Sequence, residues 1–198
     1  MSSLDENESN NSADKASLEL RALEFIKDGK LYKAEKIYRY LIDKGTQNHI
    51  TYGNLGIICG VNGNSEDMIK FLRKSIDIEP RYEQAYNNLG VALRDKNELD
   101  SAINLFEKAI KIKPDYSDAY LNLGIVMYRK LDIERAKIYY IKALEYDPIN
   151  IKAFNSLAIT YEHENEFDKA ILCYKKALKI KPLSSQICKN LANSYLKK

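Results

Sequence analysis

The four prolines of this chain are evenly spaced, and this spacing restricts the fold more than any other feature of the sequence. They stand 34 residues apart, at Pro80, Pro114, Pro148 and Pro182. A fixed period of roughly 20–50 residues is typical of repeat proteins, in which each unit buries its apolar face against its neighbours. The period therefore predicts a stack of small units. It argues against the single large core that 198 residues would otherwise build.

Counting back from the prolines places the boundaries of the units. The full repeats are expected at 49–82, 83–116, 117–150 and 151–184. A degenerate repeat is expected at 15–48, where Thr46 replaces the proline, and residues 185–198 form one capping helix with a polar outer side. Residues 1–14, rich in serine, asparagine and acids, are expected to be a disordered tail. This division leaves no segment for a separate catalytic domain.

Within each unit, apolar and small residues recur at the spacing of two amphipathic α-helices. Counted from the start of each unit, position 8 is always small: Ala22, Gly56, Gly90, Gly124, Ala158 and Ala192. Position 24 is bulky: Tyr38, Leu72, Phe106, Tyr140 and Tyr174. Large side chains over small ones predict close packing between neighbouring helices. Position 15, which holds Gly29, Gly63, Asn97, Leu131 and Asn165, is mostly a residue that tolerates the left-handed conformation ending a helix.

The order of aromatic, Leu-Gly, Ala, aromatic, Ala and Pro in 83–116 and 117–150 resembles the tetratricopeptide repeat family. The repeat at 151–184 has Ala158 in place of the glycine, and 49–82 matches more loosely. The resemblance implies an all-α fold: an α-solenoid that forms a right-handed superhelix of five helix-turn-helix units plus a C-terminal capping helix. It also implies that the first helices line a concave face. The fold alone does not name a partner.

Composition and short motifs narrow the classes of function. The chain is 45% hydrophobic and 30% charged. It has no apolar run of about 18 residues, so no membrane span is expected. It does not begin with the pattern of a secretory signal. Three cysteines without CxxC spacing fit a reducing compartment. The frequent use of Lys, Ile, Asn and Tyr suits an A+T-rich bacterial genome. We therefore predict a cytoplasmic, bacterial protein.

No set of residues with the spacing of a catalytic or metal site is present. The two histidines, His49 and His163, lie outside any HExxH pattern, and there is no phosphate-binding loop or nucleophile motif. We expect no enzyme activity, no cofactor and no metal. A net charge of +3 is modest for a nucleic-acid binder, so no nucleic-acid partner is expected. Residues 169–198 nevertheless carry eight lysines and no acid.

The strongest functional signal is a row of amides at position 6, on the predicted inner side of the first helices. The row comprises Asn54, Asn88, Asn122 and Asn190, with Ser156 as its exception. Beside it lie apolar residues at position 9, namely Ile57, Val91, Ile125 and Ile159, and position 5 adds Asn87, Leu121 and Asn155. A carboxamide both donates and accepts, so it can pair with the backbone of a bound peptide. With helices about 10 Å apart and ~3.3 Å per extended residue, the row would follow ~12 residues.

This row resembles the asparagine ladder in the tetratricopeptide superhelix of O-linked N-acetylglucosamine transferases, although the transferase domain is absent. The resemblance implies binding of extended protein substrates through Asn54, Asn88, Asn122 and Asn190. The amides could instead reflect duplication of the repeat or hydrogen bonds between helices, and both interpretations stay open here.

We expect a protein-interaction scaffold that binds an extended or helical peptide segment in its concave groove. The alternative is a self-association or assembly module, hence a homo-oligomer, or the targeting partner of a separately encoded transferase. A third interpretation is a lysine-dependent binder of acidic partners, which would weaken steeply with salt. The sequence does not identify the partner or the pathway.

Overall fold

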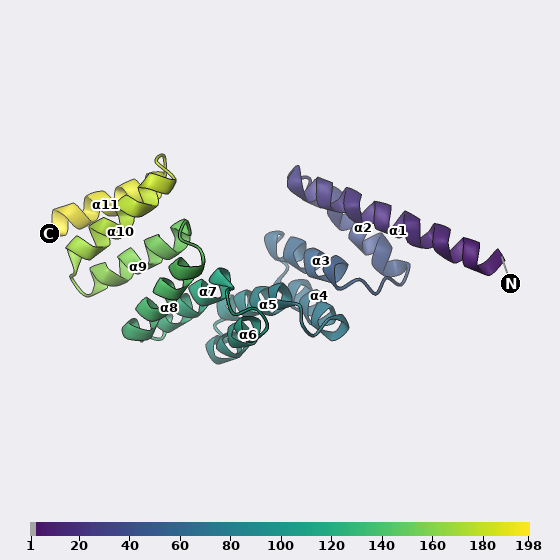
Figure 1. The fold of residues 1–198 in the computed structure, drawn as a ribbon, viewed down its shortest axis with the longest axis horizontal. Helices are drawn as coiled ribbons and strands as arrows, with labels where there is room; N and C mark the ends of the chain where they lie inside the picture. The colour runs from purple at the N-terminus through teal and green to yellow at the C-terminus, as the bar shows by residue number, and fades with distance from the viewer. Residues whose placement is uncertain (1–2) are drawn as a thin grey trace. The chain divides into compact units, whose positions relative to one another are not determined.

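The computed structural model describes residues 3–198 and consists of helices joined by short turns, with no strand in that range. The helices are α1 Ser3–Lys27, α2 Leu31–Asp43, α3 His49–Val61, α4 Ser65–Ile78, α5 Glu83–Asp95, α6 Leu99–Ile112, α7 Ser117–Arg129, α8 Ile133–Tyr146, α9 Ile151–His163, α10 Phe167–Ile180 and α11 Ser185–Lys197 (Figure 1). The all-α helical-repeat fold predicted from the proline spacing is confirmed.

The first helices of the repeats begin where the proline spacing placed them. α3, α5, α7, α9 and α11 start at residues 49, 83, 117, 151 and 185. Two of these starts, those of α3 and α9, are fixed by a side chain that accepts a hydrogen bond from a free backbone N–H of the first turn. Asn48 caps α3 by accepting from the N–H of Ile50, and Asn150 caps α9 by accepting from the N–H of Ala153.

The turn inside each unit has a left-handed residue, as the sequence predicted for Gly29, Gly63, Asn97 and Asn165 but not for Leu131. Gly29, Gly63, Asn97, Leu131 and Asn165 all have positive φ, between 61° and 81°. At Leu131 the backbone closes the end of α7 with two bonds: the N–H of Leu131 donates to the carbonyl of Tyr128, and the N–H of Asp132 donates to that of Met127. This is the Schellman arrangement, which satisfies carbonyls that a helix end leaves free.

The first helix differs from expectation at its start. The sequence predicted a disordered tail over residues 1–14 and a repeat beginning at residue 15, whereas α1 begins at Ser3. No glycine or proline precedes Gly29, so nothing in the backbone chemistry of this segment stops the helix from extending toward the N-terminus.

The chain divides into two compact units, residues 1–92 and 93–198. In the first unit α1 pairs with α2, α2 contacts α3, and α3 pairs with α4. The core of this unit includes Ala22, Ala34, Tyr38, Leu41 and Leu55, which are at most 1% exposed. These contacts build two helical hairpins around one apolar layer.

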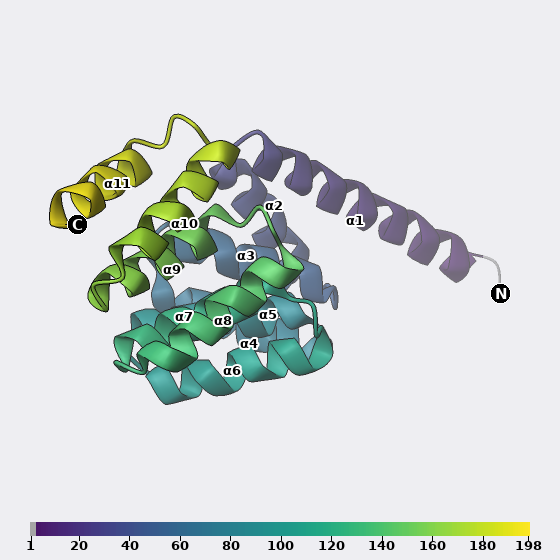
Figure 2. The same cartoon turned by 60° about the vertical axis from the view of Figure 1, so that its left-hand side comes forward.

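The second unit repeats this arrangement. α7 pairs with α8, α8 contacts α9, and α10 contacts both α9 and α11 (Figures 1 and 2). Small residues allow the close approach that the sequence predicted: a Cβ built on Gly124 would lie 2.5 Å from Cε1 of Tyr140, which is 2% exposed. In the first unit, a Cβ on Gly56 would lie 3.0 Å from Cγ of Leu72.

Candidate functional site

The face formed by the first helices carries most of the residues that the sequence singled out. Asn54, Asn88, Asn155 and Asn190 are half-buried, as are Val91, Ile125 and Ile159, while Ile57 is 38% exposed. These side chains are therefore at the surface, where a bound segment could reach them.

Three predicted binding residues are turned inward instead. Asn87, Leu121 and Asn122 are only 5%, 4% and 9% exposed. Asn87 and Leu121 share position 5, which is about 100° around the helix from position 6, and in α5 and α7 this side of the helix packs into the core. The burial of Asn87 and Leu121 leaves little surface for a ligand, and their role in peptide binding stays a prediction.

In the first unit the amide row keeps free hydrogen-bonding capacity. The Nδ2 of Asn54 donates to the hydroxyl of Tyr38 over 3.0 Å, and its Oδ1 accepts no hydrogen bond from the residues that the structure describes. The carboxamide of Asn88, on α5, makes no hydrogen bond to that part of the chain. Asn88 thus offers a donor and an acceptor, and Asn54 offers an acceptor.

In the second unit the amides mainly join helices to one another. Arg94 donates from Nη1 to Oδ1 of Asn122 over 2.9 Å. Asn190, on α11, donates to Oδ1 of Asn155 on α9 over 3.1 Å and accepts from Gln186 over 2.9 Å. For Asn122 and Asn190 the geometry favours the alternative that the row serves contacts between helices.

Part of the amide row at position 6 is explained by a contact that recurs between neighbouring repeats. The polar residue at position 6 lies beside the bulky residue at position 24 of the preceding helix, as the Asn54–Tyr38 bond shows. Tyr140 and Ser156 form the matching pair in the second unit. Burial raises the pKa of the Tyr140 phenol well above its ordinary value, and the Ser156 hydrogen bond partly opposes that rise.

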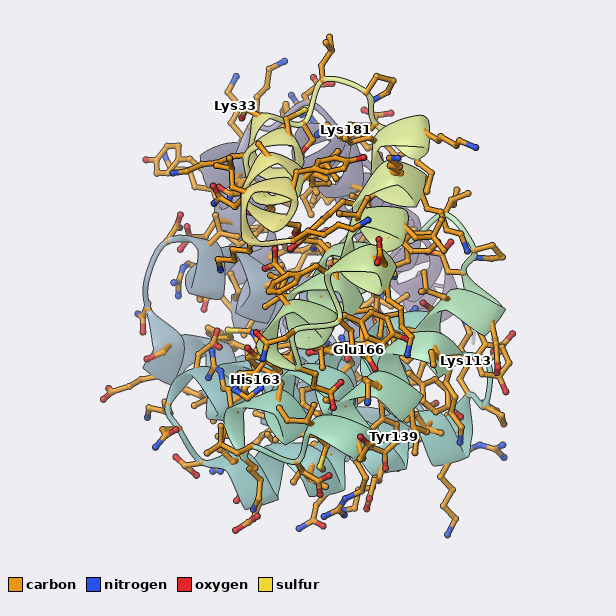
Figure 3. All side chains as sticks on the ribbon, turned by 90° about the vertical axis from the view of Figure 1, so that its left-hand side faces the viewer. Lys33, Lys113, Tyr139, His163, Glu166 and Lys181 are labelled. Atoms are coloured by element: carbon orange, nitrogen blue, oxygen red, sulfur yellow. The ribbon has the colours of Figure 1, made fainter. Side chains whose placement is uncertain are left out.

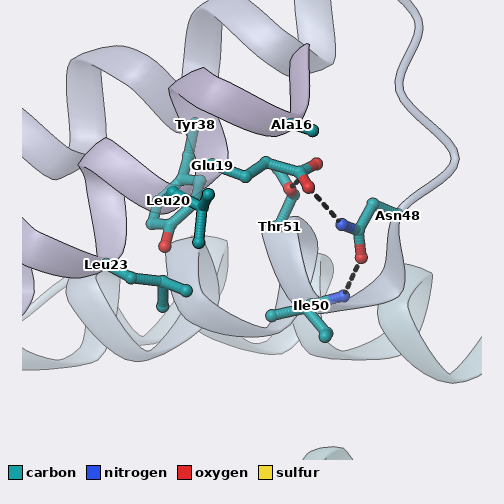
Figure 4. Close-up of a pocket in the computed structure, with 8 residues that line it drawn as sticks. All are labelled: Ala16, Glu19, Leu20, Leu23, Tyr38, Asn48, Ile50 and Thr51. Carbon is teal, nitrogen blue, oxygen red and sulfur yellow. Dashed lines mark hydrogen bonds between the residues drawn. The ribbon is translucent and has the colours of Figure 1, made fainter. Parts of the chain in front are cut away.

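A pocket lies between α1 and α3 in the first unit and encloses about 330 Å³. Its lining, shown in Figure 4, consists of Ala16, Glu19, Leu20, Leu23, Tyr38, Asn48, Ile50 and Thr51. Leu20, Leu23 and Ile50 are 65%, 37% and 41% exposed, so the pocket presents an open apolar surface. Large exposed apolar residues gathered at one hollow are typical of interaction sites.

One charged side chain is held at the wall of this pocket. Oε2 of Glu19 accepts from Nδ2 of Asn48 over 2.7 Å, and Oε1 accepts from the hydroxyl of Thr51 over 3.1 Å (Figure 4). Oδ1 of the same Asn48 accepts from the N–H of Ile50. These bonds tie α1 to the start of α3 and fix the carboxylate, so the shape of the pocket is set before any ligand arrives.

This pocket was not predicted from the sequence, because residues 15–48 match the repeat pattern poorly. A signal was nevertheless present: Leu20 occupies position 6, where the later repeats have a polar residue, and it stands next to the position-9 apolar row. An apolar residue on the predicted open face marks a place where a partner side chain can bind.

The described residues contain no cluster of three or more histidine, cysteine, aspartate or glutamate side chains that could hold a metal ion. His163, labelled with Glu166 at the α9–α10 turn in Figure 3, packs its ring edge-to-face with Tyr128 at a centroid distance of 6.0 Å. Among the described helices, none combines the length and the apolar character needed to cross a membrane.

Comparisons with known proteins agree with the repeat architecture. Sequence profiles described as tetratricopeptide repeat match residues 50–82, 117–150 and 151–182, and a profile described as TPR repeat matches residues 92–130. Together these matches cover more than half of the chain. The comparison with curated proteins finds no significant match.

Several solved structures are similar to this chain. A structure of MamA is 27% identical, with a TM-score of 0.67 over 81% of this chain and 94% of that one. TTC0263, a thermophilic TPR protein in Thermus thermophilus, is 20% identical with a TM-score of 0.77 over 92% and 99%. PilF from Pseudomonas aeruginosa is 16% identical with a TM-score of 0.79 over 95% and 91%. The last two show similarity of fold alone.

Proposed function

Because this chain belongs to the tetratricopeptide repeat family, we propose that it is a non-enzymatic scaffold that binds a peptide segment of another protein on the face of its first helices. Members of this family generally mediate protein–protein interactions. The finer assignment, an extended or helical segment held by amides and apolar side chains, is our proposal. The cytoplasmic location expected from the cysteines stays a prediction.

The observation that carries the proposal is the pocket between α1 and α3. It has an exposed apolar lining and lies on the helix that bears Asn54, whose Oδ1 is open to a ligand N–H. Ile57, one turn further along α3, adds exposed apolar surface. An apolar anchor combined with amide atoms that are free to hydrogen-bond suits recognition of a peptide, because side chains supply area and the backbone supplies hydrogen bonds.

We propose that an apolar side chain of the partner enters this pocket while Asn54 and Asn88 pair with its backbone. The Glu19 bonds hold the pocket in place, which lowers the ordering cost of binding. In the second unit, Ile125 and Ile159 are the surface residues left for contact, because Asn122 is bonded to Arg94 and Asn155 and Asn190 are bonded to each other. Each unit would thus contribute its own set of contacts.

The test uses peptides selected from a random 12-residue library displayed on phage, with the full chain as bait. The affinity of each selected peptide is then measured by fluorescence anisotropy for wild type and for the double variant Asn54→Ala/Asn88→Ala. We expect the double variant to bind at least about fivefold more weakly, since two hydrogen bonds of about 0.5–1.5 kcal/mol each are removed. Circular dichroism checks that the variant keeps its helices.

A matched control is Asn104→Ala, which removes an exposed asparagine from the second helix α6. We expect this variant to bind the selected peptides as tightly as wild type. If the Asn54/Asn88 double variant retained full affinity for every selected peptide, the proposed role of the amide row would be wrong.

A further inference from the structure

A second apolar groove lies in the second unit, mainly between the second helices of two neighbouring repeats. It encloses about 520 Å³ between α8 and α10, beside α9. Its apolar lining includes Ile141 and Leu144 of α8, Phe154 of α9, and Leu172 and Cys173 of α10. Ile141 and Leu172 are 42% and 55% exposed, so the groove is open to solvent. None of these residues is among those assigned above to peptide binding.

Comparison with the preceding repeat explains why this groove is open. In 117–150, Tyr120 is covered by two further tyrosines: Tyr146 stacks on it at a centroid distance of 5.4 Å, and Tyr139, labelled in Figure 3, lies at 6.5 Å.

One repeat later, 34 residues on, the matching positions are Phe154, Cys173 and Ile180. The ring at position 4 is kept as Phe154, but the two covering tyrosines are replaced by Cys173 and Ile180. Cys173, whose thiol is much smaller than the phenol of Tyr139, lines the groove at this position and is 8% exposed. An aromatic ring that entered the groove beside Phe154 would restore the ring contact of the preceding repeat.

The charges around the groove are mainly positive. Lys169 and Lys176 line it, and their ammonium groups lie over the rings of Tyr161 and Phe154, 5.4 Å and 5.9 Å from the centroids. Lys169 is also paired with Glu166 over 2.8 Å, and among the described residues Glu145 is the one acid in the lining.

The rest of α10 strengthens this positive character. The helix carries Lys175 and Lys179 besides the two lining lysines, against a single acid, Asp168, which pairs with Lys198. Because this surface is basic and apolar at once, it complements a segment in which acidic residues flank a large apolar side chain.

We propose that this groove binds a partner segment in which one aromatic side chain is flanked by acidic residues. The aromatic ring enters the groove beside Cys173, stacks over Phe154 and contacts Leu172. The flanking carboxylates pair with Lys169 and Lys176. Surface ion pairs contribute about 1 kcal/mol or less each, so the buried ring supplies most of the affinity and the lysines supply the preference for acidic segments.

The probe for the test is a fluorescein-labelled nine-residue peptide with one central tryptophan and glutamates on both sides. Its binding to the full chain is followed by anisotropy. The decisive variant is Cys173→Tyr, which places in the groove the ring that the preceding repeat already accommodates at Tyr139. We expect Cys173→Tyr to weaken binding at least tenfold, and replacement of the peptide's tryptophan by alanine to do the same.

A second variant tests the same groove in case Cys173→Tyr does not fold. Leu172→Glu changes an exposed position, so the helix should remain intact, and it places a negative charge where the acidic peptide binds. We expect at least a tenfold loss here too. Ile138→Ala, an exposed position on α8 outside the groove lining, is the matched control and should bind as wild type does.

The double variant Asn54→Ala/Asn88→Ala should also bind this probe as wild type does, so the two proposed surfaces can fail independently. The proposal is overturned if wild type does not bind the probe at millimolar concentration. It is equally overturned if Cys173→Tyr and Leu172→Glu bind at full strength, or if the alanine peptide binds as well as the tryptophan peptide, which would show attraction by charge alone.

Discussion

At the scale of single residues, the array depends on sites where a small residue faces a large side chain of the neighbouring helix. Gly124 lies against the ring of Tyr140, which is buried and has no room to move. Gly60 lies against the flexible side chain of Met68, which is half-buried. Both glycines would bring an added methyl group to 2.5 Å from a neighbouring atom, but only one neighbour can adapt.

We predict that Gly124→Ala lowers the free energy of unfolding by up to about 2 kcal/mol, because an overpacking cost of about 1–3 kcal/mol is offset by a gain of only about 1 kcal/mol in helix propensity. Gly60→Ala should change it by less than about 1 kcal/mol, since Met68 can take another rotamer. Urea denaturation followed by circular dichroism measures both. Equal losses in the two variants would contradict this account of the packing.

Buried tyrosines at position 24 are expected to lower the stability of the folded state at alkaline pH. Burial raises the pKa of Tyr140 in the folded state above the value of 10.0 expected in the unfolded chain. Below pH 10 the phenol is protonated in both states and its contribution to stability is complete. Above pH 10 the unfolded state loses the proton first, so stability falls as the pH rises.

We therefore predict that the free energy of unfolding decreases as the pH rises above about 10, and that the decrease is smaller in Tyr140→Phe. Phenylalanine is compatible with this position, because Phe106 fills it in α6. Tyr32→Phe, at a tyrosine that is 67% exposed, serves as the control and should follow wild type. Identical pH slopes for Tyr140→Phe and wild type would refute the assignment.

Individual residues also show how much of the candidate site could be predicted from the sequence. The periodicity correctly placed Asn54, Asn88 and the position-9 row at the surface. It could not show that Asn122 is covered and bonded by Arg94, because that depends on which side chain the preceding helix brings near. Nor could it show the pocket, which exists only when Leu20 of α1 and Ile50 of α3 are brought together by tertiary packing.

At the scale of elements, helix starts and turns were the most predictable features. Prolines, asparagine caps and left-handed residues act locally, so their spacing is enough to place α3, α5, α7, α9 and α11. The start of α1 was not predictable in this way, since residues 1–14 contain no stop signal and no apolar periodicity to mark where the helix begins.

One turn within a repeat has leucine at the left-handed position, where the other turns have glycine or asparagine. Leu131 has φ 61° and is 76% exposed, although a residue with a branched side chain is disfavoured in the left-handed region. We predict that Leu131→Asn raises the free energy of unfolding by about 0.5–1 kcal/mol, as expected when backbone preference matches the native conformation.

The reciprocal change Asn165→Leu, at the same turn one repeat later, should lower the free energy of unfolding by a similar amount. Urea midpoints of the two variants give the comparison. A less stable Leu131→Asn variant, or no change in either variant, would show that backbone preference at this turn does not determine the stability of the hairpin.

At the scale of the whole molecule, the chain carries two candidate surfaces of different composition. The face of the first helices combines amides with aliphatic side chains, and the α8–α10 groove combines an aromatic floor with lysines. Repetition explains how both arise: packing maintains the backbone of each unit, while substitutions such as Cys173 for the tyrosine of the preceding repeat change one surface without disturbing the stack.

The central claim is that the first helices bind a partner peptide, and hydrogen–deuterium exchange of the full chain with a phage-selected peptide tests it most directly. We predict slower exchange on peptide addition in α1 and α3, around Leu20, Asn54 and Ile57, with the second helices α2 and α4 unchanged. Protection confined to second helices, with none in α1 and α3, would contradict the proposed function.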